Sequence, residues 1–432
     1  MDERLKRCPL GRVANLQEEY KRFTFNYGIV MLRTRKGLSI MDSLGKRRIT
    51  KPLAWFMLYL LPISGGIALF LILGEFLVYL SPKGAEVASY VASNISPTAN
   101  LLLPGLNPYV PVVDGWIAIV TAVVIHEASH GIVARSLGMR VKTAGVLFFL
   151  VIPIGAFVEV DEKEMKEVRP SMALRVLGAG SGINFIVGLL CLLLLVVSVG
   201  SMTPLANGSA IASVNVPSPA SSAGIAPGDF IQAIDGVPNN NLGTLSLQPY
   251  QVVNITVWHD GRTEVLQNVK LGEIVYTNTK THQNTTAPYL GVSYIPYAAL
   301  TGFVSTYVNP QNEAPVRWVL YIVPPAFPGI ASSIPFSAQL NTFYTSPLGA
   351  ATNAVQNLLF WIFFVNFNLA IFNNLPIYPM DGGQAMERFL VGIGRGRISE
   401  VVAGRATAGI TVALVLVLVS VIAGPYLIAY LT

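Results

Sequence analysis

Charged residues are scarce in this chain of 432 residues. Asp, Glu, Lys and Arg make up 12% of it and hydrophobic residues 52%, whereas soluble globular proteins are about 25% charged. Several apolar runs exceed the ~20 residues that span a bilayer. The composition excludes an ordinary soluble enzyme and predicts a polytopic α-helical membrane protein.

Cysteine is nearly absent as well. Cys8 and Cys191 are the only two, which excludes a disulfide framework and a zinc site built from cysteines. A cleaved secretory signal is not expected either, because the first 52 residues are polar and basic and the first apolar run starts too late.

Five apolar runs are long enough to be transmembrane helices. We predict them at 53–81, 115–137, 172–199, 353–377 and 406–431. A further apolar segment, 145–160, is short and is interrupted by Pro153 and Gly155. It predicts a strand-like hairpin that re-enters the membrane, where its backbone groups need protein or water partners.

Basic residues alternate between the segments that join these helices. Residues 1–52 carry thirteen Lys or Arg, 82–114 carry only Lys83, and 201–350 carry four. The positive-inside rule therefore places the N-terminus in the cytoplasm and segments 82–114 and 201–350 outside. The net charge of +6 is explained by this topology, so we expect a lipid bilayer as partner and no nucleic acid.

The long outer segment predicts an inserted β-rich domain. Strand signals separated by turn residues occur in "AIASVNV", "DFIQAIDG", "VVNITVWHDG" and "YLGVSY". The remainder, rich in Pro and aromatic residues, is expected to be a linker or an interfacial segment on the outer leaflet. The predicted divisions are a basic cytoplasmic segment 1–52, helix 53–81, membrane core 115–200, β-rich domain 205–297, outer linker 298–352, membrane core 353–385 and last helix 404–432.

Histidine is also rare, yet two of the four lie in the second helix, in the HExxH pattern of His126, Glu127 and His130. Residues four apart share one helix face, so both imidazoles can bind one metal ion. Glu127 beside them can take a proton from water and pass it to a leaving amine. The alternative is a pair of hydrogen-bonded histidines with a glutamate ion pair, although ionisable groups in a membrane helix usually mark a function.

A catalytic zinc ion needs three protein ligands and one open position. Asp381 in "FNNLPIYPMDGG" is the candidate third ligand, because the predicted topology puts it at the same inner depth as the two histidines. Its alternative role is that of a turn carboxylate before two glycines. We therefore predict one zinc ion per chain, held by His126, His130 and Asp381.

Asn184 in the third helix and Asn366 and Asn373 in the fourth are polar groups at membrane depth. Asn366 and Asn373 are seven residues apart and share one face. These side chains either form interhelical hydrogen bonds or, for Asn373 and Asn184, donate to an extended substrate backbone or to the oxyanion of a tetrahedral intermediate.

These residues resemble the site-2 protease family of intramembrane zinc metalloproteases. The chain carries HExxH, an N-x-x-P-x-x-P-x-D-G pattern from Asn373 to Gly382, and a glycine-to-asparagine element in which Gly178 or Gly180 leads to Asn184. Segment 145–160 resembles the membrane-reentrant β-loop of that family. The insertion resembles a bacterial PDZ domain through "SPASSAGIAPGDFIQAIDG", where Ala223-Gly224 would open a helix and Gly228-Asp229 would start a strand.

The resemblance implies a prokaryotic enzyme that cleaves a peptide bond within the transmembrane helix of a membrane protein. Its substrates would be membrane-tethered regulators already trimmed by another protease. Zinc would be held by His126, His130 and Asp381, with Glu127 as acid and base and with Asn373 and Asn184 positioning the substrate. The PDZ-like domain would be a size filter or a docking module.

Two other classes of protein stay open. A metal transporter would use the same residues as a midplane site, and it predicts inverted repeats. A non-catalytic scaffold would bind partners through the PDZ-like domain, and it predicts that Glu127 is dispensable.

Overall fold

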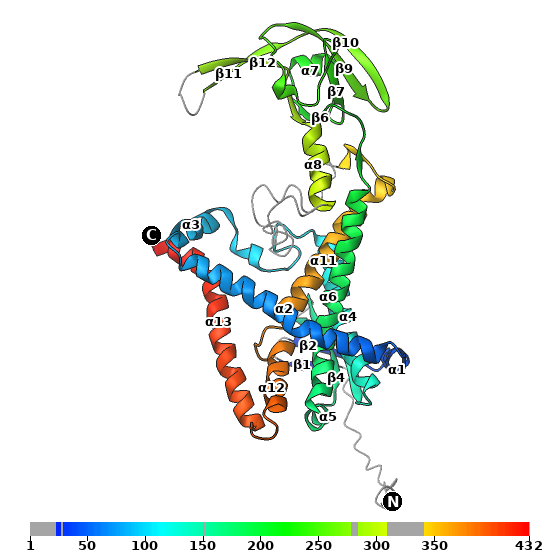
Figure 1. Cartoon of the computed structure of the whole chain (residues 1–432), viewed down its shortest axis with the longest axis vertical. Helices are drawn as coiled ribbons and strands as arrows, with labels where there is room; N and C mark the ends of the chain where they lie inside the picture. The colour runs from blue at the N-terminus through cyan, green and yellow to red at the C-terminus, as the bar shows by residue number, and fades with distance from the viewer. Residues whose placement is uncertain (1–22, 27–28, 150–151, 278–283, 309–340, 432) are drawn as a thin grey trace, which may run out of the picture.

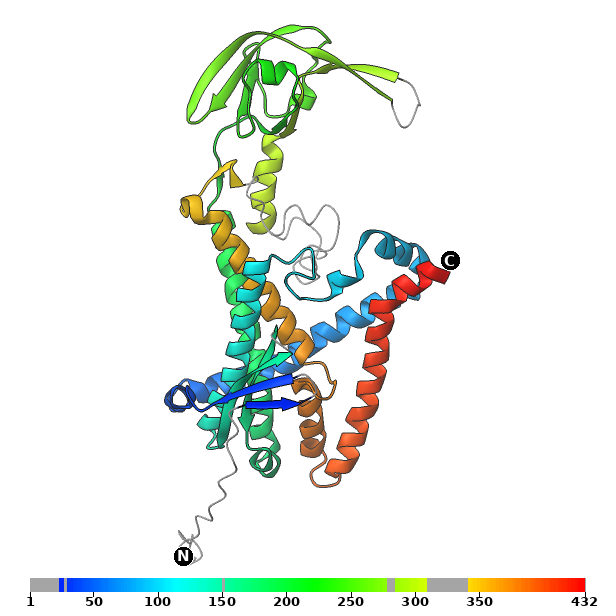
Figure 2. The ribbon, with the colours of Figure 1, turned by 180° about the vertical axis from the view of Figure 1, so that it is seen from behind.

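The computed structural model describes residues 23–26, 29–149, 152–277, 284–308 and 341–431. The molecule is elongated, with a bundle of long helices in one part and a β-rich domain at one end (Figures 1 and 2). The domain is joined to the bundle through the end of α6 and through α8, which spans Tyr297–Val308 (Figure 1).

Five helices among the described residues are long and apolar enough to cross a membrane, which confirms the number predicted. They are α2 (Thr50–Tyr79), α4 (Val112–Ser136), α6 (Pro170–Gly200), α11 (Thr352–Asn373) and α13 (Glu400–Leu431). One difference is that α11 ends at Asn373 rather than at 377 and is followed by a separate helix, α12 (Asp381–Ile393), and another is that α13 begins six residues earlier than predicted. Pro376 restricts the residue before it to non-helical backbone, which favours the early end.

The bundle is organised around α6, which packs against α2, α4 and α11. Its centre is aromatic, because α11 buries Phe360, Trp361, Phe363 and Phe364 almost completely. By contrast, α13 contacts α2, α12 and α3 (Gly84–Asn94) and runs apart from α6 and α11 (Figures 1 and 2). The HExxH residues, Asn184 and Asn373 therefore belong to a compact group of α2, α4, α6 and α11, and Asp381 begins α12, which packs against α6.

A four-stranded antiparallel sheet packs beside α4, in the order β1-β2-β3-β4. Its strands are β1 (Phe23–Asn26), β2 (Ile29–Thr34), β3 (Val141–Phe149) and β4 (Ile152–Val160). The hairpin expected at 145–160 is thus present as β3 and β4, and the basic N-terminal segment adds two strands that we did not predict. Short helices α1 (Leu38–Gly45) and α5 (Glu162–Glu167) follow β2 and β4.

The inserted domain contains a six-stranded sheet in the order β10-β9-β7-β6-β13, with β8 paired to β7. All four segments with strand signals contain strands. Ile211, Ile231 and Ile255 are fully buried in the hydrophobic core of this domain. The strands are β6 (Ser209–Val214), β7 (Phe230–Ile234), β8 (Val237–Pro238), β9 (Val252–His259), β10 (Arg262–Lys270) and β13 (Val292–Ile295).

One detail predicted for this domain is wrong. The short helix α7 spans Pro219–Ser222, so Ala223-Gly224 closes a helix and does not open one. The reason lies in the preceding residues: Ser218 and Ser221 form a reciprocal capping box that fixes the start of the helix. Gly224 follows the end of the helix with a φ of 85°, a left-handed backbone conformation that glycine adopts without strain. Phe230 begins the next strand directly after Gly228-Asp229, as predicted.

The remaining elements connect the two parts. The hairpin of β11 (Gly272–Thr277) and β12 (Asn284–Tyr289) projects from the domain (Figure 1). β5 (Thr203–Pro204) pairs with β14 (Tyr344–Thr345), which joins the two connections to the bundle. Three 3₁₀ turns complete the description, at Pro97–Asn100, Leu242–Thr244 and Gly349–Ala351. In the expected linker 298–352, α8 is helical and residues 309–340 lie outside the described residues.

Candidate active site

The two histidines of HExxH meet on one face of α4. Their Nε2 atoms are 3.2 Å apart, and the residues are only 5% and 8% exposed. The four-residue spacing brings the rings together, as the helical repeat requires. Two imidazoles so deeply buried need partners, because unpaired polar groups are costly inside a protein.

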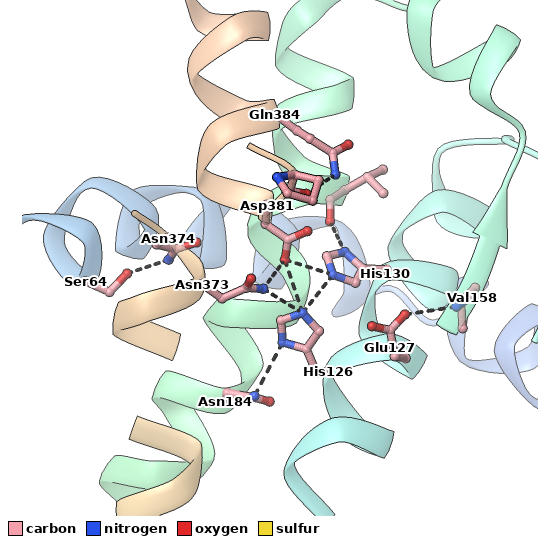
Figure 3. Close-up of polar contacts among 12 residues, drawn as sticks. Ser64, His126, Glu127, His130, Val158, Asn184, Asn373, Asn374, Asp381 and Gln384 are labelled. Carbon is pink, nitrogen blue, oxygen red and sulfur yellow. Dashed lines mark hydrogen bonds and ion pairs between the residues drawn. The ribbon is translucent and has the colours of Figure 1, made fainter. Parts of the chain in front are cut away.

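Asp381 is brought to the same point from a distant part of the sequence, at the start of α12. Its Oδ2 lies 3.1 Å from Nε2 of His126 and 3.1 Å from Nε2 of His130 (Figure 3). Asp381 is the first residue of α12, and the next residue must be small. A Cβ at Gly382 would lie 2.3 Å from the carbonyl oxygen of Leu375. The loop after α11 can fold back against α12 only because this residue is glycine.

The three donor atoms fit a metal ion. They form a nearly equilateral triangle with sides of 3.1, 3.1 and 3.2 Å. Three ligands of a tetrahedral zinc ion, each about 2.0 Å from it, are separated by about 3.3 Å. Within the described residues, this is the only cluster of three or more His, Cys, Asp or Glu side chains with that proximity.

Groups outside the triangle orient the imidazoles. Nδ1 of His130 lies 2.7 Å from the carbonyl oxygen of Val176 on α6, so an Nδ1–H donates there and Nε2 keeps its lone pair for the cluster. Gly180 on the same helix makes room for both rings. A Cβ at that position would lie 2.4 Å from Nε2 of His130 and 2.6 Å from Nε2 of His126.

Glu127 lies beside the triangle and not in it. Its Oε2 accepts a hydrogen bond of 2.9 Å from the backbone N–H of Val158 in β4 (Figure 3). The carboxylate lines a pocket of 520 Å³ together with His130 and Asp381. The pocket is therefore large enough to admit water to His130, Asp381 and Glu127 at once.

Charged side chains of β4, α5 and α12 also line the pocket. They are Glu159, Glu162, Lys166, Glu387 and Arg388. Asp161 caps α5 by accepting from two backbone N–H groups. The Arg140 guanidinium, 2.7 Å away, lowers the pKa of Asp161 to about 2, so this cap stays charged at neutral pH.

Both predicted asparagines contact His126, from different sides (Figure 3). The Nδ2 of Asn373 donates to Oδ2 of Asp381 over 2.8 Å and lies 3.1 Å from Nε2 of His126. The Nδ2 of Asn184 lies 3.4 Å from the other ring nitrogen, Nδ1. Asn373 thus faces the donor triangle, whereas Asn184 lies behind the ring. The third asparagine, Asn366, is not part of this site, since its Nδ2 donates to the carbonyl oxygen of Ile362 in its own helix.

The first long helix supports the site in a way that the sequence did not reveal. Asn374, next to Asn373, donates from Nδ2 to Oγ of Ser64 on α2 over 2.6 Å. Ser64 belongs to the stretch Ser64-Gly65-Gly66 of this helix. Small residues have several uses in membrane helices, so this stretch did not predict the contact. The Val158 N–H and the Val176 carbonyl were missed because backbone groups leave no trace in a sequence.

The bundle and the site together define a class, that of membrane metalloproteases built on HExxH. The model of Peptidase family M50 matches residues 115–418. The chain belongs to this family.

Individual relatives are distant but cover much of the chain. An uncharacterized protein of Methanocaldococcus jannaschii is 25% identical over 367 residues, which are 83% of this chain and 77% of that protein. A putative zinc metalloprotease of Clostridium perfringens is 25% identical over 63% of this chain and 85% of its own length. A membrane-bound transcription factor site-2 protease homolog of Arabidopsis thaliana is 27% identical over 45% of this chain and 37% of its own length.

Proposed function

We propose that the chain is an intramembrane zinc metalloprotease that hydrolyses a peptide bond in the transmembrane segment of membrane-protein substrates. One observation carries the proposal. The triangle of His126, His130 and Asp381, with Glu127 beside it, lies among helices that are long enough to cross a bilayer. The relatives named as a zinc metalloprotease and as a site-2 protease homolog support the same activity.

We assign the metal to His126 Nε2, His130 Nε2 and Asp381 Oδ2. A zinc ion bound there supplies Lewis acidity, which polarises a substrate carbonyl and makes water a better nucleophile. The two buried rings and the carboxylate leave one side of the triangle facing the pocket. A site with three protein ligands and an open position is the arrangement of catalytic zinc.

Glu127 moves the proton. Its carboxylate takes a proton from the attacking water and delivers it to the amide nitrogen as the C–N bond breaks. The Val158 N–H holds Oε2, which leaves Oε1 to reach the water. Asn373 directs its Nδ2 at the donor triangle. That amide can donate to the carbonyl oxygen of the scissile bond as negative charge develops on it.

The sheet offers a way to hold an unwound substrate. Among the described strands, β4 is paired on one side only, and the Val158 N–H points from its other side toward Glu127. An extended substrate segment can add to this edge through main-chain hydrogen bonds. Phe23, Phe25 and Phe149 of the sheet are 57%, 61% and 48% exposed. Apolar side chains so exposed support a sheet that re-enters the membrane.

We further propose the orientation that the basic residues favour, with the N-terminus in the cytoplasm and the inserted domain outside. We also propose that the segments predicted from the sequence, from the basic cytoplasmic segment 1–52 to the last helix 404–432, are the functional units of the chain. The PDZ-like domain would dock or filter substrates before their transmembrane segment reaches the site. Its position at one end of the elongated molecule suits that role (Figure 1).

The proposal predicts metal-dependent cleavage. The purified chain in proteoliposomes should cut a single-span peptide, 1,10-phenanthroline should stop the reaction, and added Zn²⁺ should restore it. The products, read by mass spectrometry, should derive from a cut inside the apolar segment. Cleavage that persists after complete removal of zinc would refute the proposal, and zinc binding without any cleavage would favour a transporter or a scaffold.

A further inference from the structure

Asn184 and His126 meet in an arrangement that does not suit a metal-binding imidazole. The Nδ2 of Asn184 lies 3.4 Å from Nδ1 of His126. Asn184 is fully buried and His126 is 5% exposed. Among the described residues, Oδ1 of Asn184 has no hydrogen-bond partner. A nitrogen donor thus faces the ring, while the oxygen acceptor of the same amide is unpaired.

The position of His126 fixes which ring nitrogen must carry the proton. Its Nε2 belongs to the donor triangle, 3.1 Å from Oδ2 of Asp381. A neutral imidazole that offers Nε2 to a metal carries its proton on Nδ1. That buried N–H needs an acceptor. His130 meets the same need through the carbonyl oxygen of Val176, but an amide nitrogen cannot accept a hydrogen bond from His126.

Rotating the side-chain amide of Asn184 by 180° would give the Nδ1–H of His126 an acceptor. The oxygen and nitrogen of an asparagine amide have nearly the same shape, and their assignment follows from the hydrogen-bond network. Rotation exchanges them and places Oδ1 opposite Nδ1 of His126. We propose that Asn184 is a positioning residue, whose Oδ1 accepts from the Nδ1–H of His126 and fixes the tautomer that directs Nε2 into the metal site.

This inference rests on the proposed metal site and changes the role predicted for Asn184. The amide would act through His126 and would not contact the substrate. Its place behind the ring, on the side away from Asp381 and Asn373, supports this role (Figure 3). A partner of this kind orients the ring and makes its metal-binding nitrogen more basic.

Two substitutions separate an acceptor from a donor. Asn184→Asp keeps an oxygen opposite Nδ1 and removes the N–H donor, whereas Asn184→Leu removes both at similar size. Zinc affinity would be measured by chelator competition on the purified, metal-free chain. We expect Asn184→Asp to bind zinc at least as tightly as the unmodified chain and Asn184→Leu to bind about 10- to 100-fold more weakly.

A matched control is Asn366→Leu. Asn366 is also a fully buried asparagine in a long helix, but its amide donates only to its own helix. Its loss should leave zinc affinity unchanged. The visible spectrum of the Co²⁺-loaded protein gives a readout other than activity. It should change in Asn184→Leu and be preserved in Asn184→Asp.

Each other outcome overturns the inference. Equal losses of affinity in Asn184→Asp and Asn184→Leu would mean that the amide donates. Unchanged zinc affinity in both variants would mean that Asn184 does not position His126. If both variants also lost cleavage, Asn184 would instead contact the substrate. An unmodified chain that binds no zinc would instead refute the proposed function, so the two failures can be told apart.

Discussion

Replacing Glu127 with Gln should abolish cleavage and leave zinc in place. Gln has the same size as Glu and can keep a hydrogen bond to the Val158 N–H through its amide oxygen, but it cannot take a proton from water. Loss of a general base typically lowers the rate by about 10²- to 10⁴-fold. Because Glu127 lies outside the donor triangle, the zinc content of the purified variant should remain one ion per chain.

The control is Glu75→Gln in α2. Glu75 is a glutamate in another long apolar helix, where the hydroxyl of Tyr79 contacts it at 3.3 Å, and it is absent from the pocket of the metal ligands. Cleavage by this variant should match that of the unmodified chain. If Glu127→Gln retains full activity while Glu75→Gln behaves normally, the proposed proton transfer is wrong.

Substituting Gly180 with Ala should weaken zinc binding without unfolding the protein. The added methyl would lie 2.4 Å from Nε2 of His130 and 2.6 Å from Nε2 of His126. Without metal, small shifts of the two ring ends can relieve the contact with the added methyl. With metal the rings cannot shift, because ligation fixes them. Overpacking costs about 1–3 kcal/mol, which corresponds to an affinity loss of about 5- to 150-fold.

Gly178→Ala is the matched control for this substitution. Gly178 lies half a turn away on α6, where an added methyl would meet the Cα of Leu58 at 3.4 Å, an ordinary contact. We expect zinc affinity to fall only for Gly180→Ala, while the thermal unfolding temperatures of the two metal-free variants stay similar. Equal zinc affinity in the two variants would show that α6 does not confine the rings.

The sequence was most informative where one strong constraint acts alone. The bilayer requires long apolar helices, and all five that the described residues contain were recognised. The helical repeat places His126 and His130 on one face, and the alternation of basic segments brought Asp381 to their depth. The structure puts these three side chains within 3.2 Å of one another.

Features that depend on distant pairing could not be predicted. β1 and β2 lie in the segment that we interpreted as polar and basic, and β2 is held in the sheet by pairing with β3, far along the chain. The start of α12 at Asp381 was missed, because two prolines before it suggested only a turn. The contact of Asn374 with Ser64 joins residues 310 positions apart. No local pattern in the sequence reports such a contact.

Zinc content is the most direct test of the central claim, that one ion is held by residues from α4 and α12. The unmodified chain and Asp381→Ala, purified in parallel, would be analysed for zinc per chain. We expect one ion in the unmodified chain and well below one in Asp381→Ala, because two imidazoles alone hold zinc poorly. Equal zinc content in the two proteins would contradict the account.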